Sequence, residues 1–435
     1  MTDTAANVLL SNNAAGLAKA TAIILADTAA NLVSSANAGA LTKATSVQLT
    51  GTANGVTAAQ VQTLAGLKGF VMGTGATLVV TDTAANILLA GNASGLNNAT
   101  SIILADTAVN LLSSANAAAI AKATSIQLTG ATNILTAAQA TVLAGLQGFS
   151  KVSGATLVIT DTAANILFAD NAAGLSKATS IVLADTAANL LSSSNSDAIT
   201  KATSIQLTGA SNGVSAAQAK TLAGLKGFTL GVGAALVVTD TAANILLSGN
   251  AAGLAKATKI VLADTAANLL SSANAGAITE ATSILLTGVY NRVSVAEAKT
   301  LSGLKGFSVG VDATLAVADT AAKILLAGNA GQLSSATSVE VTGVANAVTA
   351  AQATQLFRLN GLAVSSDSTL FIMDTATNLL LSGNANALSK ATSVQLVGTS
   401  NFVSAVQATK LAVLNGFSIE ANGALIVADT AANLI

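Results

Sequence analysis

Short runs of apolar, β-branched residues recur along the chain at regular intervals. They begin at Thr21 (TAIILA), Thr45 (TSVQLT), Thr77 (TLVVTD), Thr100 (TSIILA) and Thr124 (TSIQLT), in steps of 24, 32, 23 and 24 residues. Runs of this length and composition are typical of strands buried on both faces of a parallel sheet. A recurring period of this size predicts a solenoid, in which each repeat is one structural unit that packs against its neighbours.

Each strand-like run is followed by a segment with helical periodicity. In residues 179–202 (TSIVLADTAANLLSSSNSDAITKA), Asp185 stands at the expected N-cap, and apolar residues then recur at helical spacing. An Asp followed sixteen residues later by a Lys, as in Asp27 and Lys43, suits the two ends of a helix dipole. We therefore expect a strand, a tight turn and one helix in each short coil.

The 32-residue coils predict a helix that begins later. A Gly replaces the Asp, and a Ser or Thr then precedes a Gln or Glu by three residues, which is the spacing of a capping box. The predicted caps are Thr57, Thr136, Ser215, Ser294, Thr349 and Ser404.

These patterns predict an α/β solenoid of about seventeen stacked strand–helix coils of 23–24 and 32 residues, with a parallel sheet. A right-handed β-helix is the alternative, because Gly91 and Asn92 weaken the helix of one short coil. We expect residues 1–435 to form a single continuous solenoid, with super-repeats of 79 residues to about residue 313 and of 55–56 residues from 314 to 435. Because the sequence starts and stops inside a unit, we expect a segment of a longer array or a subunit that stacks end to end.

An Asn follows the strand in every coil but one, where Lys323 takes its place. An inward Asn bonds backbone groups that a turn leaves unpaired, so we expect these side chains to form a structural ladder. Ligand binding is the alternative role. The predicted ladder comprises Asn31, Asn54, Asn86, Asn110, Asn133, Asn165, Asn189, Asn212, Asn244 and Asn268.

Composition narrows the class of function. Hydrophobic residues make up 52% of the chain and charged residues 9%, the formal net charge is -1, and Cys and His are absent. The commonest acid–base, thiolate and metal-ligand chemistry is therefore missing, and we expect no enzyme and no catalytic or cofactor-binding residue. Scattered Lys and Arg predict no nucleic-acid partner, and polar residues interrupt each apolar run before the roughly 18 residues of a membrane span.

The regular Asp series raises one metal hypothesis. If neighbouring coils bring carboxylates together, Asp82, Asp106, Asp161 and Asp185 are candidate calcium ligands. Helix capping accounts for the same residues without a metal. We expect no other cofactor.

A few positions depart from the repeat. Two interpretations of them remain open: a small recognition patch, or neutral variation at an exposed edge. Ser and Thr beside the strands suggest a second hypothesis, a regular hydroxyl array that orders water or binds glycans. The departures are Tyr290 and Arg292, with Glu280 and Glu297 near them in sequence, and Phe357 with Arg358.

The segments VTDTAANILL, LADTAANLL, KATSIQLTG and VSAAQAKTLAGLKGF resemble the alanine-rich DTAAN-type repeat arrays of large secreted or surface-attached bacterial proteins, which are adhesin-like or surface-layer-like. The resemblance covers essentially the whole chain. It implies an extracellular or cell-surface location and a role as spacer, adhesin stalk or matrix component. Such proteins often also carry calcium-binding repeats, which this sequence lacks.

The sequence therefore favours a non-enzymatic structural or adhesive repeat segment that acts as an extended spacer or stacking element. Its expected partners are other copies stacked end to end, or neighbouring repeats of a longer chain. Two alternatives remain open. One is a binding module that presents a repetitive face to glycan, ice or protein, including a cell-surface glycan or protein, and the other is a self-assembling filament or surface-layer subunit.

Overall fold

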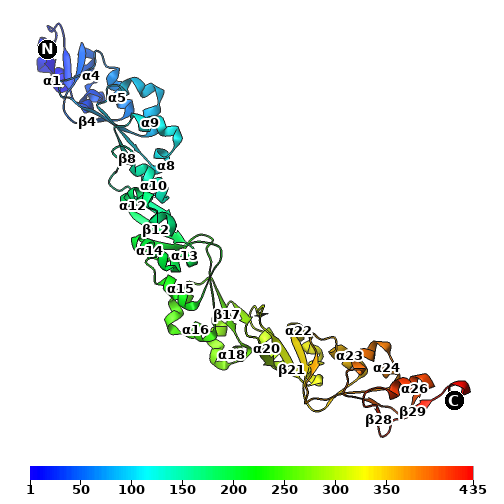
Figure 1. The fold of residues 1–435 in the computed structure, drawn as a ribbon. Helices are drawn as coiled ribbons and strands as arrows, with labels where there is room; N and C mark the ends of the chain where they lie inside the picture. Colours follow the sequence, from blue (N-terminus) through cyan, green and yellow to red (C-terminus); the bar gives the residue numbers. More distant parts are fainter. Residues whose placement is uncertain (435) are drawn as a thin grey trace. The chain divides into compact units, whose positions relative to one another are not determined.

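In the computed structural model, which describes residues 1–434, short parallel strands alternate with short helices (Figure 1). The chain divides into two compact units, unit 1 (Met1–Gly209 with Leu225–Gly233) and unit 2 (Ala210–Gly224 with Ala234–Ile435). Both units are built from the same kind of strand–helix coil. The predicted α/β solenoid with parallel sheets is confirmed, and the β-helix alternative is wrong because helices follow the strands. The continuity of one solenoid over the whole chain stays a prediction.

Unit 1 contains three sheets in which all strand pairs are parallel. The first has the order β1 (Thr2–Asp3), β2 (Ile24–Asp27), β3 (Ser46–Leu49), β5 (Val71–Met72). The second has the order β10 (Ser150–Lys151), β8 (Ser125–Leu128), β7 (Ser101–Asp106), β6 (Leu78–Asp82), β4 (Asn54–Val56). The third has the order β15 (Thr229–Leu230), β13 (Ser204–Leu207), β12 (Ser180–Asp185), β11 (Leu157–Asp161), β9 (Asn133–Leu135).

Unit 2 repeats this arrangement, again with parallel pairing. The first sheet has the order β14 (Asn212–Val214), β16 (Leu236–Asp240), β17 (Lys259–Asp264), β18 (Ser283–Leu286), β20 (Ser308–Val309). The second has the order β19 (Asn291–Val293), β21 (Leu315–Asp319), β22 (Ser338–Val341), β24 (Ala363–Val364), and the third has the order β23 (Asn346–Val348), β25 (Leu370–Asp374), β26 (Ser393–Leu396), β28 (Ser418–Ile419). The last is the pair β27 (Asn401–Val403), β29 (Leu425–Val427).

The pairing register shifts equivalent residues from one coil to the next. Asp82 and Asp106 end consecutive strands and are 24 residues apart, but Asp82 lies opposite Leu104, two residues before Asp106. The end of each strand therefore extends past the end of the preceding strand. This stagger brings the residue that ends the strand to the helix of the preceding coil.

The helical segment of every short coil before the last is split in two, so the prediction of one helix is wrong. In one such coil, α3 (Ala29–Leu32) is followed by a 3-10 helix at Ser35–Asn37 and then by α4 (Ala38–Lys43). Ser34 has an extended backbone, with ψ 127. Asn37 Nδ2 donates to the carbonyl oxygen of Asn31 at 2.9 Å, and so takes the place of the i+4 backbone donor at a carbonyl that otherwise accepts only a longer bond of 3.3 Å from the Ser34 N–H.

The same split recurs in both units. The first helices are α1 (Ala5–Leu9), α3, α6 (Ala84–Leu88), α8 (Ala108–Leu111), α11 (Ala163–Leu167), α13 (Ala187–Leu191), α16 (Ala242–Leu246), α18 (Ala266–Leu269), α21 (Ala321–Ile324), α24 (Ala376–Leu379) and α27 (Ala431–Leu434). The second helices are α2 (Ala14–Leu17), α4, α7 (Ala93–Leu96), α9 (Ala117–Lys122), α12 (Ala172–Lys177), α14 (Ser196–Lys201), α17 (Ala251–Leu254), α19 (Ala275–Glu280), α22 (Ala330–Ser334) and α25 (Ala385–Leu388).

Thr, and not Asp, is the N-cap of the first helix in these coils. Asp185 is the last residue of β12, and Thr186 takes the N-cap position of α13, where its side chain accepts from the N–H of Asn189. The N-cap prediction for Asp185 is therefore wrong by one residue. The Asp185 carboxylate can therefore accept a hydrogen bond from the preceding coil, where the N–H of Ala163 donates to its Oδ2.

The long-coil helices begin where the sequence predicted. All six predicted caps form a complete capping box with the Gln or Glu three residues later. Gly51, between β3 and β4, has φ +89, a conformation that favours glycine at this turn. The helices are α5 (Ala58–Ala65), α10 (Ala137–Ala144), α15 (Ala216–Ala223), α20 (Val295–Ser302), α23 (Ala350–Leu356) and α26 (Ala405–Ala412).

The core of each unit is a continuous layer of small aliphatic side chains between strands and helices. In unit 1, Leu25, Leu49 and Ala29 are fully buried. Close packing needs glycine at one contact: a Cβ on Gly95 of α7 would lie 2.5 Å from the Cα of Gln62 in α5. The thin layers therefore follow from the small residues that dominate the composition.

Candidate functional site

The regular Asp residues form contacts between successive coils. Asp106 is 4% exposed, and its Oδ2 accepts from the N–H of Ala84, the first residue of α6 in the preceding coil, at 2.9 Å. Its Oδ1 accepts from the N–H of Thr107 at 2.8 Å and from Asn110 Nδ2 at 2.7 Å. The first N–H groups of a helix have no partner within the helix. Each carboxylate therefore caps the helix of the coil before it and holds the turn of its own coil.

In the long coils an Asn caps the helix of the preceding coil and also donates hydrogen bonds to backbone carbonyls. The Oδ1 of Asn133 accepts from the N–H of Ala108 in the preceding coil at 2.9 Å. Its Nδ2 donates to the carbonyl oxygens of Thr129 and Gly130 in its own coil, at 2.9 and 3.2 Å, and of Thr156 in the next coil, at 3.0 Å. One amide thus joins three consecutive coils.

We call this series of oxygen atoms the capping ladder. Each member bonds the first N–H of a helix in the preceding coil of its own unit. The carboxylates are those of Asp27, Asp82, Asp106, Asp161, Asp185, Asp240, Asp264, Asp319, Asp374 and Asp429. The amides are those of Asn54, Asn133, Asn291, Asn346 and Asn401.

The expected Asn ladder needs a correction. Only three of the ten predicted side chains are buried: Asn54, Asn133 and Asn212. The other seven are exposed, because they lie on the outer face of the first helix and donate Nδ2 to the Asp Oδ1 four residues earlier. These seven are Asn31, Asn86, Asn110, Asn165, Asn189, Asn244 and Asn268.

A second Asn series, which was not among the sequence-based predictions, lies six residues after the first. Each of these side chains donates Nδ2 to the carbonyl oxygen of the residue six positions earlier and so closes the end of the first helix. The constant spacing of six residues was the signal available in the sequence. The series is Asn13, Asn37, Asn92, Asn116, Asn171, Asn195, Asn250, Asn274, Asn329 and Asn384.

Lys323 stands where the other short coils have the first Asn, and it still contacts the Asp four residues earlier. Its Nζ lies 3.1 Å from Asp319 Oδ1, the atom to which an Asn amide donates in the other short coils. Asp319 still caps the preceding helix through Oδ2, which accepts from the N–H of Val295 at 3.3 Å. An ammonium group therefore replaces the amide donor at this coil.

The four candidate calcium ligands do not converge. Asp82 lies opposite Leu104, and Asp161 lies opposite Leu183, so the carboxylates of consecutive coils are offset by two residues. Both oxygens of each carboxylate already accept from N–H donors, as for Asp106 and Asp185. Within residues 1–434 no group of three or more His, Cys, Asp or Glu side chains is placed to hold a metal ion.

The departures from the repeat form separate contacts. Arg292 pairs with Glu340, with its Nη2 2.9 Å from Oε2, and not with Glu280 or Glu297. Tyr290 is 94% exposed. In the other group, Lys390 Nζ lies 5.2 Å from the centre of the Phe357 ring, and Arg358 lines a small hollow beside that ring.

Within residues 1–434, three carboxyl groups have lowered pKa values, and each shift has a local cause. The Ser294 backbone N–H and then its hydroxyl lower the pKa of Glu297. The Asn7 amide and the Thr4 N–H lower the pKa of Asp3, and the Asn433 amide with the N–H groups of Ala405 and Thr430 lowers that of Asp429. All three shifts come from hydrogen bonds to ionised carboxylates in the capping ladder, a turn or a capping box.

The chemistry of the capping ladder is structural. Among the described residues, every buried side-chain polar atom has a hydrogen-bond partner. None of the helices within residues 1–434 is long and apolar enough to cross a membrane. No family model and no curated protein matches the sequence.

Proposed function

We propose that this chain is a non-enzymatic structural repeat segment, which acts as a spacer or stacking element of a secreted or surface-attached bacterial protein. The observation that carries the proposal is the capping ladder, because each coil supplies the hydrogen-bond acceptor that the helix of the preceding coil needs. A coil is therefore completed by its successor, and length is added one coil at a time.

Two further features support the proposal. The Asp and Asn side chains of the capping ladder join coils, and the other recurring Asn side chains brace the turns and helix ends of their own coil, so the recurring polar groups serve assembly of the repeat and do not converge on a reactive site. The resemblance to DTAAN-type repeats supports the extracellular or cell-surface location. Low charge and the absence of Cys and His agree with a role that depends on geometry and not on chemistry.

Deleting one super-repeat tests the proposal. Residues 77–155 span one 79-residue period, so their removal joins coils in phase. We expect the deletion variant to keep its helix content per residue by circular dichroism and to lose maximum dimension by small-angle scattering in proportion to the coils removed. The matched control deletes residues 77–143, which joins the chain out of phase and should lower the cooperativity of unfolding.

Two results would contradict the spacer role. One is an unchanged maximum dimension after the in-phase deletion, and the other is equal stability of the in-phase and out-of-phase variants. Either result would mean that the number of phased coils does not set the length of the protein.

A further inference from the structure

A large apolar side chain is exposed at one equivalent position in the first short coil of each super-repeat. These side chains are 53% to 65% exposed, and they belong to Leu10, Leu89, Phe168, Leu247, Leu326 and Leu381. In the next short coil the equivalent residue is a serine: Ser34, Ser113, Ser192 and Ser271. Because the same fold accepts serine at this position, folding does not require the apolar residue.

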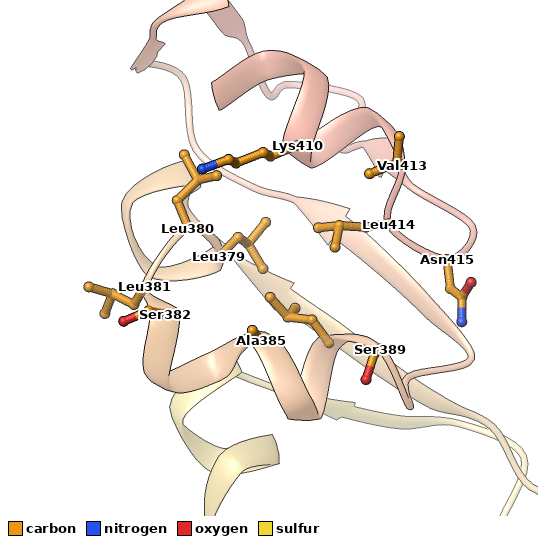
Figure 2. Close-up of a pocket in the computed structure, with 11 residues that line it drawn as sticks. Leu379, Leu380, Leu381, Ser382, Ala385, Ser389, Lys410, Val413, Leu414 and Asn415 are labelled. Atoms are coloured by element: carbon orange, nitrogen blue, oxygen red, sulfur yellow. The ribbon is translucent and has the colours of Figure 1, made fainter. Parts of the chain in front are cut away.

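In unit 2 each of these leucines borders a groove between its own coil and the next. The groove beside Leu381 has a volume of about 430 Å³ and is lined mainly by leucines of the α24–α25 coil and by Leu414, which follows α26. Figure 2 shows Leu379 and Leu414 facing each other across this groove, with Lys410 extending from α26 toward Leu380. Lys410 is the single charged residue of the lining.

The other two grooves have the same construction but different charge. The groove beside Leu247, about 460 Å³, has Glu280 as its one charged lining residue. The groove beside Leu326, about 350 Å³, has no charged lining residue and is closed by Gln355 and Leu359. Along unit 2 the grooves are therefore acidic, neutral and basic in chain order.

We propose that two copies of this chain pair side by side through this face of unit 2, in antiparallel orientation. In that arrangement the Leu247 groove of one copy receives Leu381 of the other, and Glu280 meets Lys410. A two-fold axis makes the same contact twice. A parallel pair would instead place Glu280 on Glu280 and Lys410 on Lys410, so charge complementarity selects the antiparallel pair.

The chemistry of the face argues for a second copy as its occupant. The exposed leucines of one copy enter leucine-lined grooves of about 430 and 460 Å³ on the other copy, and burying them removes apolar surface from water. A polyanionic partner fits this face less well, because it would be attracted by Lys410 in one groove but repelled by Glu280 in another. Lateral pairing goes beyond the proposed spacer role, which a single chain performs, so the failure of one does not decide the other.

Sedimentation velocity of the full chain over a range of concentrations tests the pairing. We expect a monomer–dimer equilibrium. Leu247→Ser and Leu381→Ser, which introduce the residue of the neighbouring coil, should each raise the dimer dissociation constant by about tenfold or more. Leu89→Ser in unit 1 is the matched control and should leave it within about twofold, and circular dichroism should show all variants folded.

A charge exchange tests the orientation. Glu280→Lys or Lys410→Glu alone should weaken the dimer about tenfold, and the double variant should recover wild-type affinity. Lys68→Glu in unit 1 makes the same change in net charge as Lys410→Glu and should have no effect. A wild-type chain that stays monomeric at all concentrations, or a dimer insensitive to both leucines, overturns the proposal. So does Leu247-dependent binding to phosphatidylcholine vesicles by a monomeric chain, which would assign the leucines to a lipid surface.

Discussion

Asp106 in a short coil and Asn133 in the following long coil occupy the same place in the capping ladder but bond differently. Both cap the helix of the preceding coil with one oxygen at 2.9 Å. The other oxygen of Asp106, Oδ1, accepts from the N–H of Thr107 and from the side-chain amide of Asn110. The Nδ2 of Asn133 instead donates to three carbonyl oxygens. The side chain at each rung therefore matches the hydrogen-bonding needs of its own turn.

The turn itself sets this difference. In the long coil Gly130 has φ +91, and the chain turns there so that two carbonyl oxygens of its own coil accept from the Asn133 amide. In the short coil the helix begins at once, so its free N–H groups need an acceptor. A carboxylate can only accept, whereas an amide both accepts and donates. Asp and Asn are thus not interchangeable in the ladder.

Asn133→Asp should have the largest effect on stability. It would place a buried carboxylate against three carbonyl oxygens and remove their donor, and we expect a loss of about 3–5 kcal/mol in the free energy of unfolding at pH 7. Urea unfolding followed by circular dichroism measures the loss, and exposed Asn12→Asp is the control. Protonation of the new acid restores one donor, so the loss should shrink as the pH falls. Equal effects at both sites would show that the amide donor is unnecessary.

Asp106→Asn should cost less, about 1–3 kcal/mol, because one acceptor oxygen remains and the new NH₂ group faces donors. The same urea experiment measures the loss. Asp170→Asn, at an exposed position outside the ladder, serves as the control. If Asp106→Asn were neutral, the carboxylate would be dispensable and the distinction between the two kinds of coil would not hold.

Lys323 offers a smaller test of the same rule. Its side chain is 67% exposed, so we expect Lys323→Ala to cost no more than about 1 kcal/mol. Lys323→Asn restores the donor found in the other short coils and should leave stability close to wild type. Added salt should weaken the wild-type contact and leave that of the Asn variant unchanged. A larger loss in Lys323→Asn than in Lys323→Ala would contradict this interpretation.

Local signals predicted the main strand of each coil and the six capping boxes correctly, because both depend on residues close in sequence. The three-residue strands of the long coils, such as β4, were not predicted. Thr57 and Gln60, for example, bond each other within one helical turn. The contacts of Asp106 could not be predicted in this way. Its partner Ala84 is 22 residues earlier, and the contact depends on a register offset of two residues that the sequence period does not reveal.

The interrupted helix has a similar explanation. Periodicity alone favoured one helix from Asp27 to Lys43, since apolar residues continue at helical spacing. The backbone instead becomes extended at Ser34, and Asn37 replaces the missing main-chain donor. A side chain that substitutes for a backbone group leaves no trace in hydrophobic periodicity.

The smallest predicted effect concerns the one long coil that uses Glu in its capping box. Hydrogen bonds from Ser294 lower the pKa of Glu297 below its ordinary value of 4.5, so its stabilising contribution is present above about pH 4.5 and is lost as the pH falls through the lower, folded-state value. Glu297→Gln introduces the residue found in the other five boxes, and it should remove this pH dependence. Gln218→Glu should create it in the neighbouring long coil. We expect thermal melting at pH 7 and pH 3 to show a larger decrease for wild type than for Glu297→Gln. Identical decreases would mean that the charge of Glu297 adds nothing to a box that an amide completes equally well.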